Sequence, residues 1–268
     1  MSNLQSYRTN ITSQFGEDGI VEEILNRLGE GERRCVEFGA WDGRHYSNTW
    51  KLWHDRGWSA ILIEGDYEKY AALQESLAAF PEVLALHAMV SWEGEDRLDQ
   101  LLRRAGVNGR IDVMSIDIDG DDYHVFAAIT DYLPRILLVE FNPTCPPGAV
   151  FVQEKGGRFG SSATSILRMA ESKGYALAAC TDTNLILVRQ EEFGRLGIPP
   201  LELSAILPRD HLTYLMTDYD GVAYLSQPPV YMSEVPSGAW QFFRNRLTKW
   251  TRFRVGNAFP VRIIRLRK

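Results

Sequence analysis

Cysteine is scarce in this sequence, with three among 268 residues. Cys35, Cys145 and Cys180 lie far apart and form neither a Cys-x-x-Cys pair nor an even set. This usage argues against a disulfide framework and against a structural zinc site. It indicates buried thiols in a reducing compartment.

Long apolar runs are also missing. No stretch is long and apolar enough for a transmembrane helix, and the first residues lack the cationic and then apolar pattern of a secretory signal. We therefore expect a cytoplasmic protein, either free or peripheral at the inner face of a membrane. The content of 45% hydrophobic and 24% charged residues is typical of one large globular α/β domain.

Acidic residues are absent from the end of the chain. From Arg244 onward there are nine Lys or Arg and no acid, so the net charge of −6 divides into +9 there and −15 over residues 1–243. An acidic body argues against nucleic acid as a partner, because phosphate contacts need clustered cations. Aromatic and apolar residues recur among these cations at helical spacing: Trp240, Phe243, Leu247 and Trp250. This tail either lies on an anionic membrane surface or packs on the domain or on a second subunit of a homo-oligomer.

Apolar periodicity predicts strands that alternate with helices through most of the chain. Helices are expected over 16–27, 47–56, 67–80, 97–105, 123–132 and 162–173, and strands over 34–39, 59–64, 83–90, 112–118, 135–140, 175–180 and 184–189. This order predicts an α/β fold, with a mainly parallel seven-stranded sheet, helices on both faces and a terminal antiparallel hairpin. We expect one domain over residues 1–200, with its core at 13–190, and an extension over 201–268 whose basic amphipathic tail begins at about 240.

The turn after the first predicted strand carries the clearest ligand signature. Glu37 is followed by Gly39 and Gly43, and glycines at such a turn adopt positive φ and let the backbone approach a ligand. Glu64 ends the next strand, 21 residues after Gly43, where an acid can accept hydrogen bonds from ribose hydroxyls. The alternative is a structural turn followed by a solvated acid.

Two adenosine-containing cofactors fit this topology. A nicotinamide dinucleotide needs the fingerprint G-x-G-x-x-G, with its pyrophosphate at a helix N-terminus. Here Trp41 stands two residues after Gly39 and would crowd the pyrophosphate, and Glu37 would repel it. S-adenosylmethionine instead presents an ammonium and a sulfonium to that acid. The charge pattern therefore favours the methyl donor.

Four segments together resemble the FkbM-type branch of S-adenosylmethionine-dependent methyltransferases: 13–18 (SQFGED), 36–43 (VEFGAWDG), 62–66 (LIEGD) and 115–120 (SIDIDG). The resemblance covers roughly residues 13–190 and implies a Rossmann-like class I methyltransferase fold. It also implies that residues 14–18 close over the cofactor, that the glycine turn holds its methionine end, that Glu64 holds the ribose, and that the end of the third strand contacts the adenine. The cofactor residues expected on these grounds are Gln14, Glu37, Gly39, Trp41, Asp42, Gly43, Glu64, Met89, Val90 and Asp117.

Carboxylates follow the fourth and fifth predicted strands. Asp117 and Asp119 are expected on one face of a strand end, and Glu140 and Asn142 form a similar pair on the next strand. Such oxygen ligands suit Mg²⁺ or another divalent cation, and the arrangement is similar to that of metal-dependent O-methyltransferases. A cation there would orient a substrate hydroxyl and lower its pKa. The alternative is that Asp117 binds cofactor or substrate directly and Asp119 caps the next helix.

Asp119 and His124 are the expected catalytic residues. His124 lies one turn into the helix after the acids, where it could accept a hydroxyl proton near neutral pH; a partly exposed structural histidine is the alternative. His45 and Tyr46 are further candidates for the acceptor pocket. The Pro- and Gly-rich loop over 144–162 follows the fifth strand and is interpreted as a substrate lid, with two cations for anionic groups, or as a variable surface loop. Those cations are Lys155 and Arg158.

These patterns predict an S-adenosylmethionine-dependent O-methyltransferase that acts on a hydroxyl of a sugar, a surface glycan or a secondary metabolite. The acceptor class depends on the family resemblance alone. Two alternatives remain open. One is an NAD-dependent or nucleotide-sugar oxidoreductase, and the other is a non-catalytic cofactor-binding module that scaffolds a glycan assembly complex.

Overall fold

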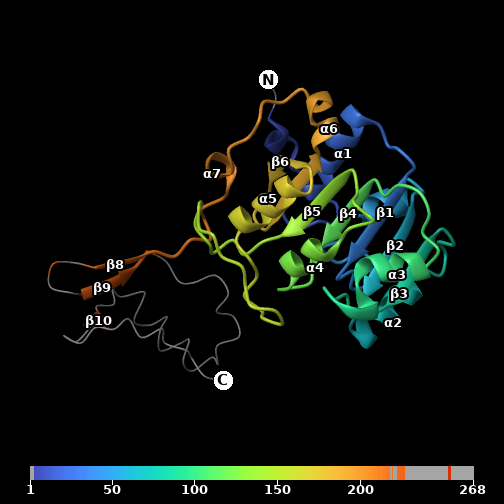
Figure 1. Ribbon diagram of the computed structural model, residues 1–268, viewed down its shortest axis with the longest axis horizontal. Coiled ribbons are helices and arrows are strands. Elements are labelled where there is room, and N and C mark those ends of the chain that lie inside the picture. The colour runs from blue at the N-terminus through green and yellow to red at the C-terminus, as the bar shows by residue number, and fades with distance from the viewer. Residues whose placement is uncertain (1–2, 218, 220–221, 227–252, 255–268) are drawn as a thin grey trace. The chain divides into compact units, whose positions relative to one another are not determined.

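The computed structural model describes residues 3–217, 219, 222–226 and 253–254 (Figure 1). The chain divides into two compact units, Met1–Arg209 and Asp210–Lys268. Apart from 253–254, the predicted amphipathic tail lies outside the described residues. Within the described part of the chain, no helix has both the length and the apolar character needed to cross a bilayer.

A seven-stranded sheet forms the centre of the first unit (Figure 1). Its strands are β1 (Arg34–Phe38), β2 (Ser59–Glu64), β3 (Val83–His87), β4 (Val113–Ile116), β5 (Ile136–Glu140), β6 (Tyr175–Cys180) and β7 (Asn184–Arg189). Their order is β3-β2-β1-β4-β5-β7-β6, with β1 to β5 parallel and β7 antiparallel to both of its neighbours. This confirms the predicted α/β fold with a mainly parallel sheet and a terminal hairpin.

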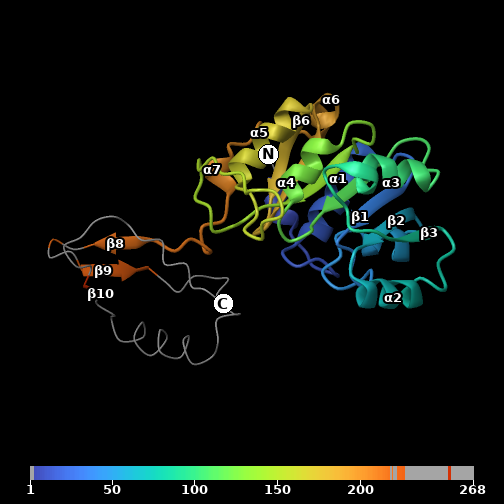
Figure 2. The same cartoon turned by 60° about the horizontal axis from the view of Figure 1, so that its bottom comes forward.

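Helices cover both faces of the sheet, because alternate strand residues point to opposite sides. Val36 of β1 belongs to one core and Cys35 to the other. The Val36 side is covered by α3 (Leu98–Arg104), α4 (Asp122–Ala128), α5 (Ala163–Ser172) and α7 (Leu203–Ile206). The Cys35 side is covered by the 3₁₀-helix η1 (Leu4–Tyr7), α1 (Glu17–Leu28), the π-helix η2 (Lys51–Asp55), α2 (Tyr67–Ser76) and α6 (Gln190–Phe193). Figure 2 shows α3 and α2 on opposite sides of the sheet.

Several predicted element ends are wrong, and two of these errors concern the site. β3 ends at His87 and β4 at Ile116, so Met89, Val90 and Asp117 lie in loops beyond their strands. The helix predicted over 47–56 contains the short π-helix η2, and the helices predicted to end at 80 and 132 end at Ser76 and Ala128. A small antiparallel sheet in the second unit was not predicted. Its strands are β8 (Leu215–Thr217), β9 (Val222–Leu225) and β10 (Phe253–Arg254).

A buried ion-pair network lies at the amino-terminal ends of β4 and β5. Arg135 is 4% exposed, and its guanidinium donates to Asp112 at 2.9 Å and to Glu192 at 2.7 Å. It also donates to the carbonyl oxygens of Leu28 and Gly29 at the end of α1. One side chain therefore joins α1, α6 and the starts of two strands. The hydrogen bond from Arg135 lowers the pKa of Glu192.

Candidate cofactor and acceptor site

The carboxyl ends of four neighbouring strands lie side by side. We call the border of the sheet that they form the carboxyl edge. Phe38 at the end of β1 pairs with Ile63 of β2 and Ile116 of β4, and Ile116 pairs with Val139 of β5. The residues that follow these positions therefore reach the same edge. In open α/β sheets, ligands bind in the crevice beyond this edge.

The glycine turn after β1 has the positive φ that its sequence predicts, with +76° at Gly39 and +81° at Gly43. The structure also gives Gly39 a second reason to be glycine. A Cβ there would overlap the carbonyl oxygen of Asp117, so the loop after β4 occupies the space that a side chain would fill. Asp42 accepts backbone hydrogen bonds from Arg44 and His45, which closes the next turn.

Glu64 is held at the end of β2 and is 6% exposed. Its two carboxylate oxygens accept from the backbone N–H groups of Trp41 and Asp66, each at 2.8 Å. Each oxygen keeps one lone pair, which a ribose hydroxyl could use. Met89 lies beside this strand end, because a Cβ on Gly65 would come within 2.7 Å of its sulfur atom, and its side chain is 72% exposed.

Glu37 is buried, and its carboxylate accepts hydrogen bonds from other residues of the protein. Its carboxylate accepts from the hydroxyls of Ser47 at 2.6 Å and Thr49 at 2.7 Å, and from the backbone N–H of Asn48 at 2.8 Å. Burial raises the pKa of Glu37, while these donors favour its ionised form. Three of its four acceptor positions are thus used to hold residues 47–49. One acceptor position therefore remains for the contact that the sequence predicts between Glu37 and the methionine end of the cofactor.

The segment that contains Gln14 lies at the same edge. One oxygen of Asp18 accepts from the backbone N–H groups of residues 11–13, and the hydroxyl of Thr12 donates to the carbonyl of Ser47 at 3.0 Å. Glu17 accepts a hydrogen bond from Asn184 at the start of β7. Gln14 itself is exposed between these anchors. The segment therefore lies next to residues 47–49, which Glu37 holds.

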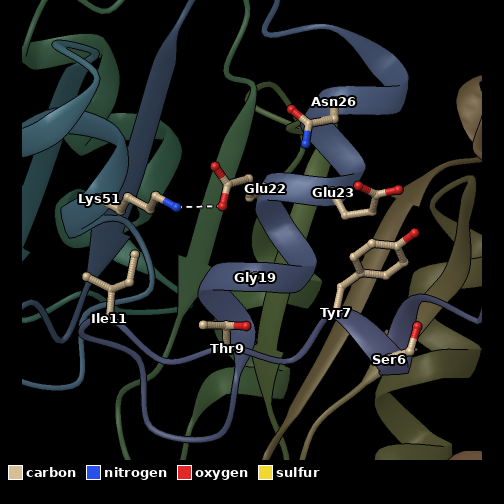
Figure 3. A pocket seen from close by; sticks show the side chains of 9 residues that line it. All are labelled: Ser6, Tyr7, Thr9, Ile11, Gly19, Glu22, Glu23, Asn26 and Lys51. Carbon is tan, nitrogen blue, oxygen red and sulfur yellow. Dashed lines mark hydrogen bonds and ion pairs between the residues drawn. The ribbon is translucent and has the colours of Figure 1, made fainter.

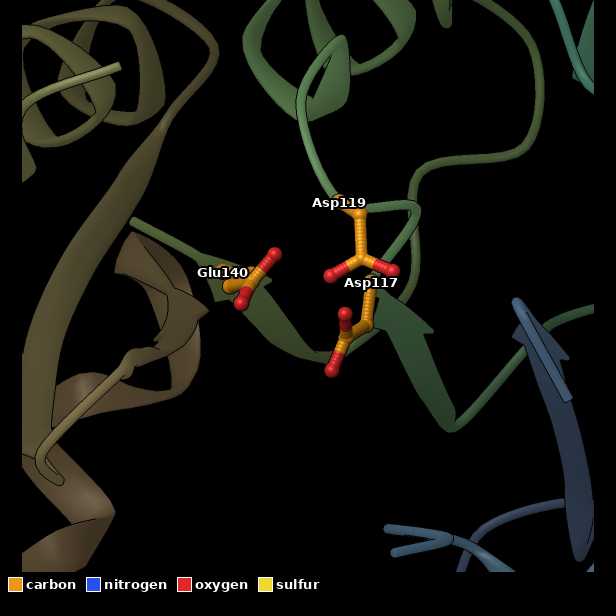
Figure 4. Close-up of side chains that lie close together, drawn as sticks. All are labelled: Asp117, Asp119 and Glu140. Carbon is orange, nitrogen blue, oxygen red and sulfur yellow. The ribbon is translucent and has the colours of Figure 1, made fainter. Parts of the chain in front are cut away.

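Three carboxylates converge where β4 and β5 end (Figure 4). Asp117, Asp119 and Glu140 each offer an oxygen, and these oxygens lie within 4.8 Å of one another. The convergence was predicted, but strand alternation is the wrong reason for it. The strand has already ended, and Asp119 has a left-handed backbone with φ of +57°. Asp122, rather than Asp119, accepts the turn's backbone hydrogen bonds, from Ile118 and Gly120.

Among the described residues, neighbouring carboxylates disfavour the charged state of this carboxylate triad. Burial, followed by the charges of Asp122 and Asp119, raises the pKa of Asp117 to about 8. Burial and Asp117 also raise the pKa of Glu140 well above its usual range, and burial raises that of Asp122 to about 6. A cation among these oxygens would relieve the repulsion. The set consists of carboxylate oxygens alone, which fits a hard divalent cation.

Asn142, the fourth predicted metal ligand, has its amide engaged in the loop after β5. Its Oδ1 accepts from the backbone N–H of Thr144 at 2.8 Å and from the Thr144 hydroxyl at 2.5 Å. Its Nδ2 donates to the carbonyl oxygen of Phe159. The structure thus shows Asn142 organising the loop, and its role as a ligand stays a prediction.

Gln153 fastens this loop to α4, a role for which the sequence offers no local signal. It is 3% exposed, and its Nε2 donates to Asp121 at 2.9 Å and to the carbonyl of Gly157 at 3.1 Å. Its Oε1 accepts from the backbone N–H groups of Phe159 and Gly160 at 3.0 and 2.6 Å. All four hydrogen-bonding positions of the amide are therefore used.

The backbone of the same residue determines which ring nitrogen of His124 carries the hydrogen. The backbone carbonyl oxygen of Gln153 lies 2.8 Å from His124 Nε2. Because a carbonyl only accepts, Nε2 carries the hydrogen, and Nδ1 is left as the proton-accepting atom of a neutral ring. The predicted general base is thus restricted to one nitrogen.

The predicted lid passes beside the carboxylate triad. A Cβ on Gly120 would come within 2.6 Å of the carbonyl oxygen of Gly157, and Gly160 packs against Asn142. Lys155 has its ammonium 5.3 Å from the centre of the Trp92 ring, and Arg158 is exposed. The loop therefore crosses the edge between the ends of β4 and β5, where the sequence predicted it.

A cavity of about 290 Å³ lies elsewhere, between α1, the N-terminal segment and η2 (Figure 3). It is lined by Ser6, Tyr7, Thr9, Ile11, Gly19, Glu22, Glu23, Asn26 and Lys51. Glu22 and Lys51 form an ion pair across it at 2.5 Å. None of the residues predicted to bind cofactor, acceptor or metal contributes to its lining.

No protein-family model and no curated protein sequence matches the chain. Among solved structures, it is similar to the CMeT domain of the citrinin polyketide synthase (TM-score 0.43, 15% identity), over 65% of this chain and 51% of that one. It is also similar to the N-terminal domain of EvdMO1 in the presence of SAH and D-fucose (TM-score 0.43, 12% identity, 65% and 82% of the two chains). A third is the SAH-bound Podospora anserina methyltransferase PaMTH1 (TM-score 0.42, 15% identity, 64% and 78%). The chain thus spans about half the length of the first of these structures.

Proposed function

We propose that this protein is an S-adenosylmethionine-dependent O-methyltransferase that acts on a hydroxyl of a sugar, a surface glycan or a secondary metabolite. One observation carries the proposal. Glu64, placed to accept from ribose hydroxyls, and the carboxylate triad, suited to a cation that holds an acceptor, lie at the same edge of one sheet. Methyl transfer needs donor and acceptor side by side in this way.

The groups at this edge fit S-adenosylmethionine better than a dinucleotide. Glu64 retains acceptor positions for the ribose, and the nearby acids attract a sulfonium and repel a pyrophosphate. Trp92, in the loop that follows β3, has an indole N–H that is buried without a hydrogen-bond partner among the described residues. It is thus an unused donor in the loop expected to contact the adenine.

Backbone strain also gathers here. Among the described residues, four non-glycine residues have positive φ, and three of them lie in the loops after β1 and β4: Trp41, Tyr46 and Asp119. A left-handed conformation costs such residues about 1–3 kcal/mol each, and it is found preferentially at functional sites. The clustering supports this edge as the working face of the protein.

The residues at the edge supply the parts that O-methylation needs. S-adenosylmethionine, when bound, offers a methyl group on a sulfonium, which leaves as S-adenosylhomocysteine when an oxygen takes the methyl. Asp117, Asp119 and Glu140 would hold a divalent cation, whose chemistry there is to lower the pKa of the acceptor hydroxyl. His124 would take the hydroxyl proton on Nδ1.

Removal of the Glu64 carboxylate is expected to weaken S-adenosylhomocysteine binding. Hydrogen bonds to a charged group contribute about 1.5–3 kcal/mol, so Glu64→Ala should raise the Kd about 10- to 150-fold in calorimetry. Glu32→Ala changes a 52% exposed carboxylate just before β1 begins, at the opposite ends of the strands, and this control should bind as the parent protein does. Unchanged affinity in Glu64→Ala would reject the assignment, and thermal stabilisation by NAD instead of S-adenosylhomocysteine would favour an oxidoreductase.

Binding of a divalent cation should tighten as the pH rises. The cation and the proton compete for Asp117, whose pKa is raised to about 8, so the affinity for Mn²⁺ should increase from pH 6 to pH 8 and then level off. Calorimetry in buffers of different ionisation enthalpy should show proton release at pH 7. If Mn²⁺ does not bind at pH 8 in the presence of S-adenosylhomocysteine, the cation site is rejected, and direct contact of Asp117 with cofactor or substrate is the role that is left.

A further inference from the structure

The loop after β5 exposes apolar side chains that a folded protein normally covers. Val150, Phe151, Val152 and Phe159 are 58%, 41%, 38% and 55% exposed. The rings of Phe151 and Phe159 are in edge-to-face contact, with centroids 5.1 Å apart, so residues far apart in the loop form one surface. We call these four residues the apolar ledge. The contact between Phe151 and Phe159 joins two of these groups into one exposed apolar surface, and surfaces of this kind mark binding sites.

The apolar ledge begins beside the carboxylate triad. The carbonyl oxygen of Phe159 is held by Asn142, two residues after Glu140. On the other side, the Cα atom of Arg158 lies 3.5 Å from the position that a Cβ of Gly120 would take, next to Asp119. A molecule with a hydroxyl at the triad could therefore rest its body on the ledge.

The backbone under the apolar ledge is fixed. Phe151 exchanges hydrogen bonds with Ser162, donating to its hydroxyl at 3.1 Å and accepting from its N–H at 2.9 Å. Phe159 is held by Gln153, which is itself bonded to Asp121. The ledge is thus preformed, so a ligand that binds there pays little ordering entropy.

We propose that the apolar ledge receives the flat body of the acceptor, and that the acceptor is a hydroxylated aromatic compound rather than a sugar. None of the four ledge side chains carries a hydrogen-bonding group. A sugar can offer such a surface only its C–H face and gains no hydrogen bond there, whereas a flat aromatic ring can contact both phenylalanine rings over its whole face. This inference rests on the proposed function and narrows its acceptor to an aromatic alcohol or phenol.

Binding of two probes tests the inference: catechol, and methyl β-D-glucopyranoside as the polyhydroxylated control. The full chain is mixed with S-adenosylhomocysteine and Mg²⁺, and each probe is titrated by saturation-transfer NMR. Catechol should bind saturably and more tightly than the glucoside. Phe159→Ser and Phe151→Ser should each weaken catechol at least about five-fold, because both side chains are exposed and their loss removes stacking area. Leu84→Ser, which removes a 42% exposed apolar side chain from β3, should leave it unchanged.

Tighter binding of the glucoside, no binding of catechol, or equal catechol binding by the phenylalanine variants would each overturn the inference. If instead the variants lost only their co-sedimentation with phosphatidylcholine vesicles, the ledge would be a lipid-contact surface, and an aromatic acceptor would be rejected. The signal of S-adenosylhomocysteine in the same samples separates the two levels of failure. Its absence would reject the proposed function together with the inference, and its presence without catechol binding would reject the inference alone.

Discussion

Replacement of Asp117 by asparagine is expected to raise the thermal stability of the metal-free protein while weakening divalent-cation binding by about 100-fold or more. The two effects share one cause. Burial and neighbouring carboxylates raise the pKa of Asp117 from 3.8 to about 8, so its ionised form is disfavoured in the folded state. Asparagine carries no charge, so the repulsion within the triad falls. It also removes a charged carboxylate oxygen that would bind the cation. Stabilisation of about 1–2 kcal/mol is the scale expected when an unfavourable functional group is neutralised.

The sign of the pH dependence follows from the direction of the pKa shift. A carboxyl with a raised folded-state pKa penalises folding increasingly as the pH rises above its unfolded pKa, and the penalty is complete above its folded pKa. The stability gap between Asp117→Asn and the parent protein should therefore widen between pH 4 and pH 8, as measured by thermal unfolding in EDTA. Asp131→Asn, at an exposed ion pair with Arg103, should show no such trend. A destabilised Asp117→Asn variant, or a gap that narrows with rising pH, would contradict the account of the triad.

Replacement of Arg135 by methionine is expected to lower the free energy of unfolding by about 3–5 kcal/mol. The change leaves Asp112, which is fully buried, without its counter-ion, and it removes the shortest ion pair of Glu192, which keeps Arg195 and Arg110 at 3.4 and 3.5 Å. It also removes a hydrogen-bond donor from the carbonyl oxygen of Gly29 at the end of α1. Urea unfolding measures the loss. Arg103→Met is the matched control, because its ion pair with Asp131 is exposed and should contribute less than about 1 kcal/mol.

A further variant allows the test to be made even if Arg135→Met alone does not fold. Replacing Asp112 by Asn as well removes the uncompensated buried charge and should recover most of the lost stability. The dependence of the stability on pH in the acidic range offers a second check. Arg135 lowers the pKa of Glu192, so this pair stabilises the parent protein above pH 4.5 and loses that contribution as the pH falls through the folded-state pKa. The fall should be shallower in the variant, and an equal fall would show that the pair is not coupled.

The sheet could be predicted from the sequence because its strands are short, largely apolar runs, which are mostly buried in all but the edge strand β3. The bounds of β6 and β7 agree with the prediction at both ends. The prediction failed at β4, where apolar residues continue to Ile118 although the strand ends at Ile116. There the carbonyl of Asp117 approaches Gly39, and Asp119 turns into the left-handed region. Both are tertiary effects that strand periodicity does not register.

The site was predictable where it depends on strand ends. Asp117 and Glu140 each follow one residue of the in-register pair Ile116 and Val139, so their proximity follows from sheet topology alone. The hydrogen bonds of Gln153 and Glu37 could not be foreseen. Gln153 reaches Asp121 across about thirty residues of sequence, and Glu37 reaches hydroxyls ten and twelve residues away. Such contacts depend on loop conformation, for which the sequence has no periodic signal.

The loop that carries the apolar ledge is closed at its base, since the backbone N–H of Asn142 donates to the carbonyl oxygen of Ser161 at 2.9 Å. Its two ends therefore meet where β5 stops and α5 is about to begin, and the side chain of Gln153 bonds to the backbone of the loop itself and to Asp121, just before α4. A segment of this kind can be exchanged as a cassette. Under the proposed function, transplanting a different sequence between these two residues should change the acceptor while the register of the sheet and the loops after β1 and β2 stay the same.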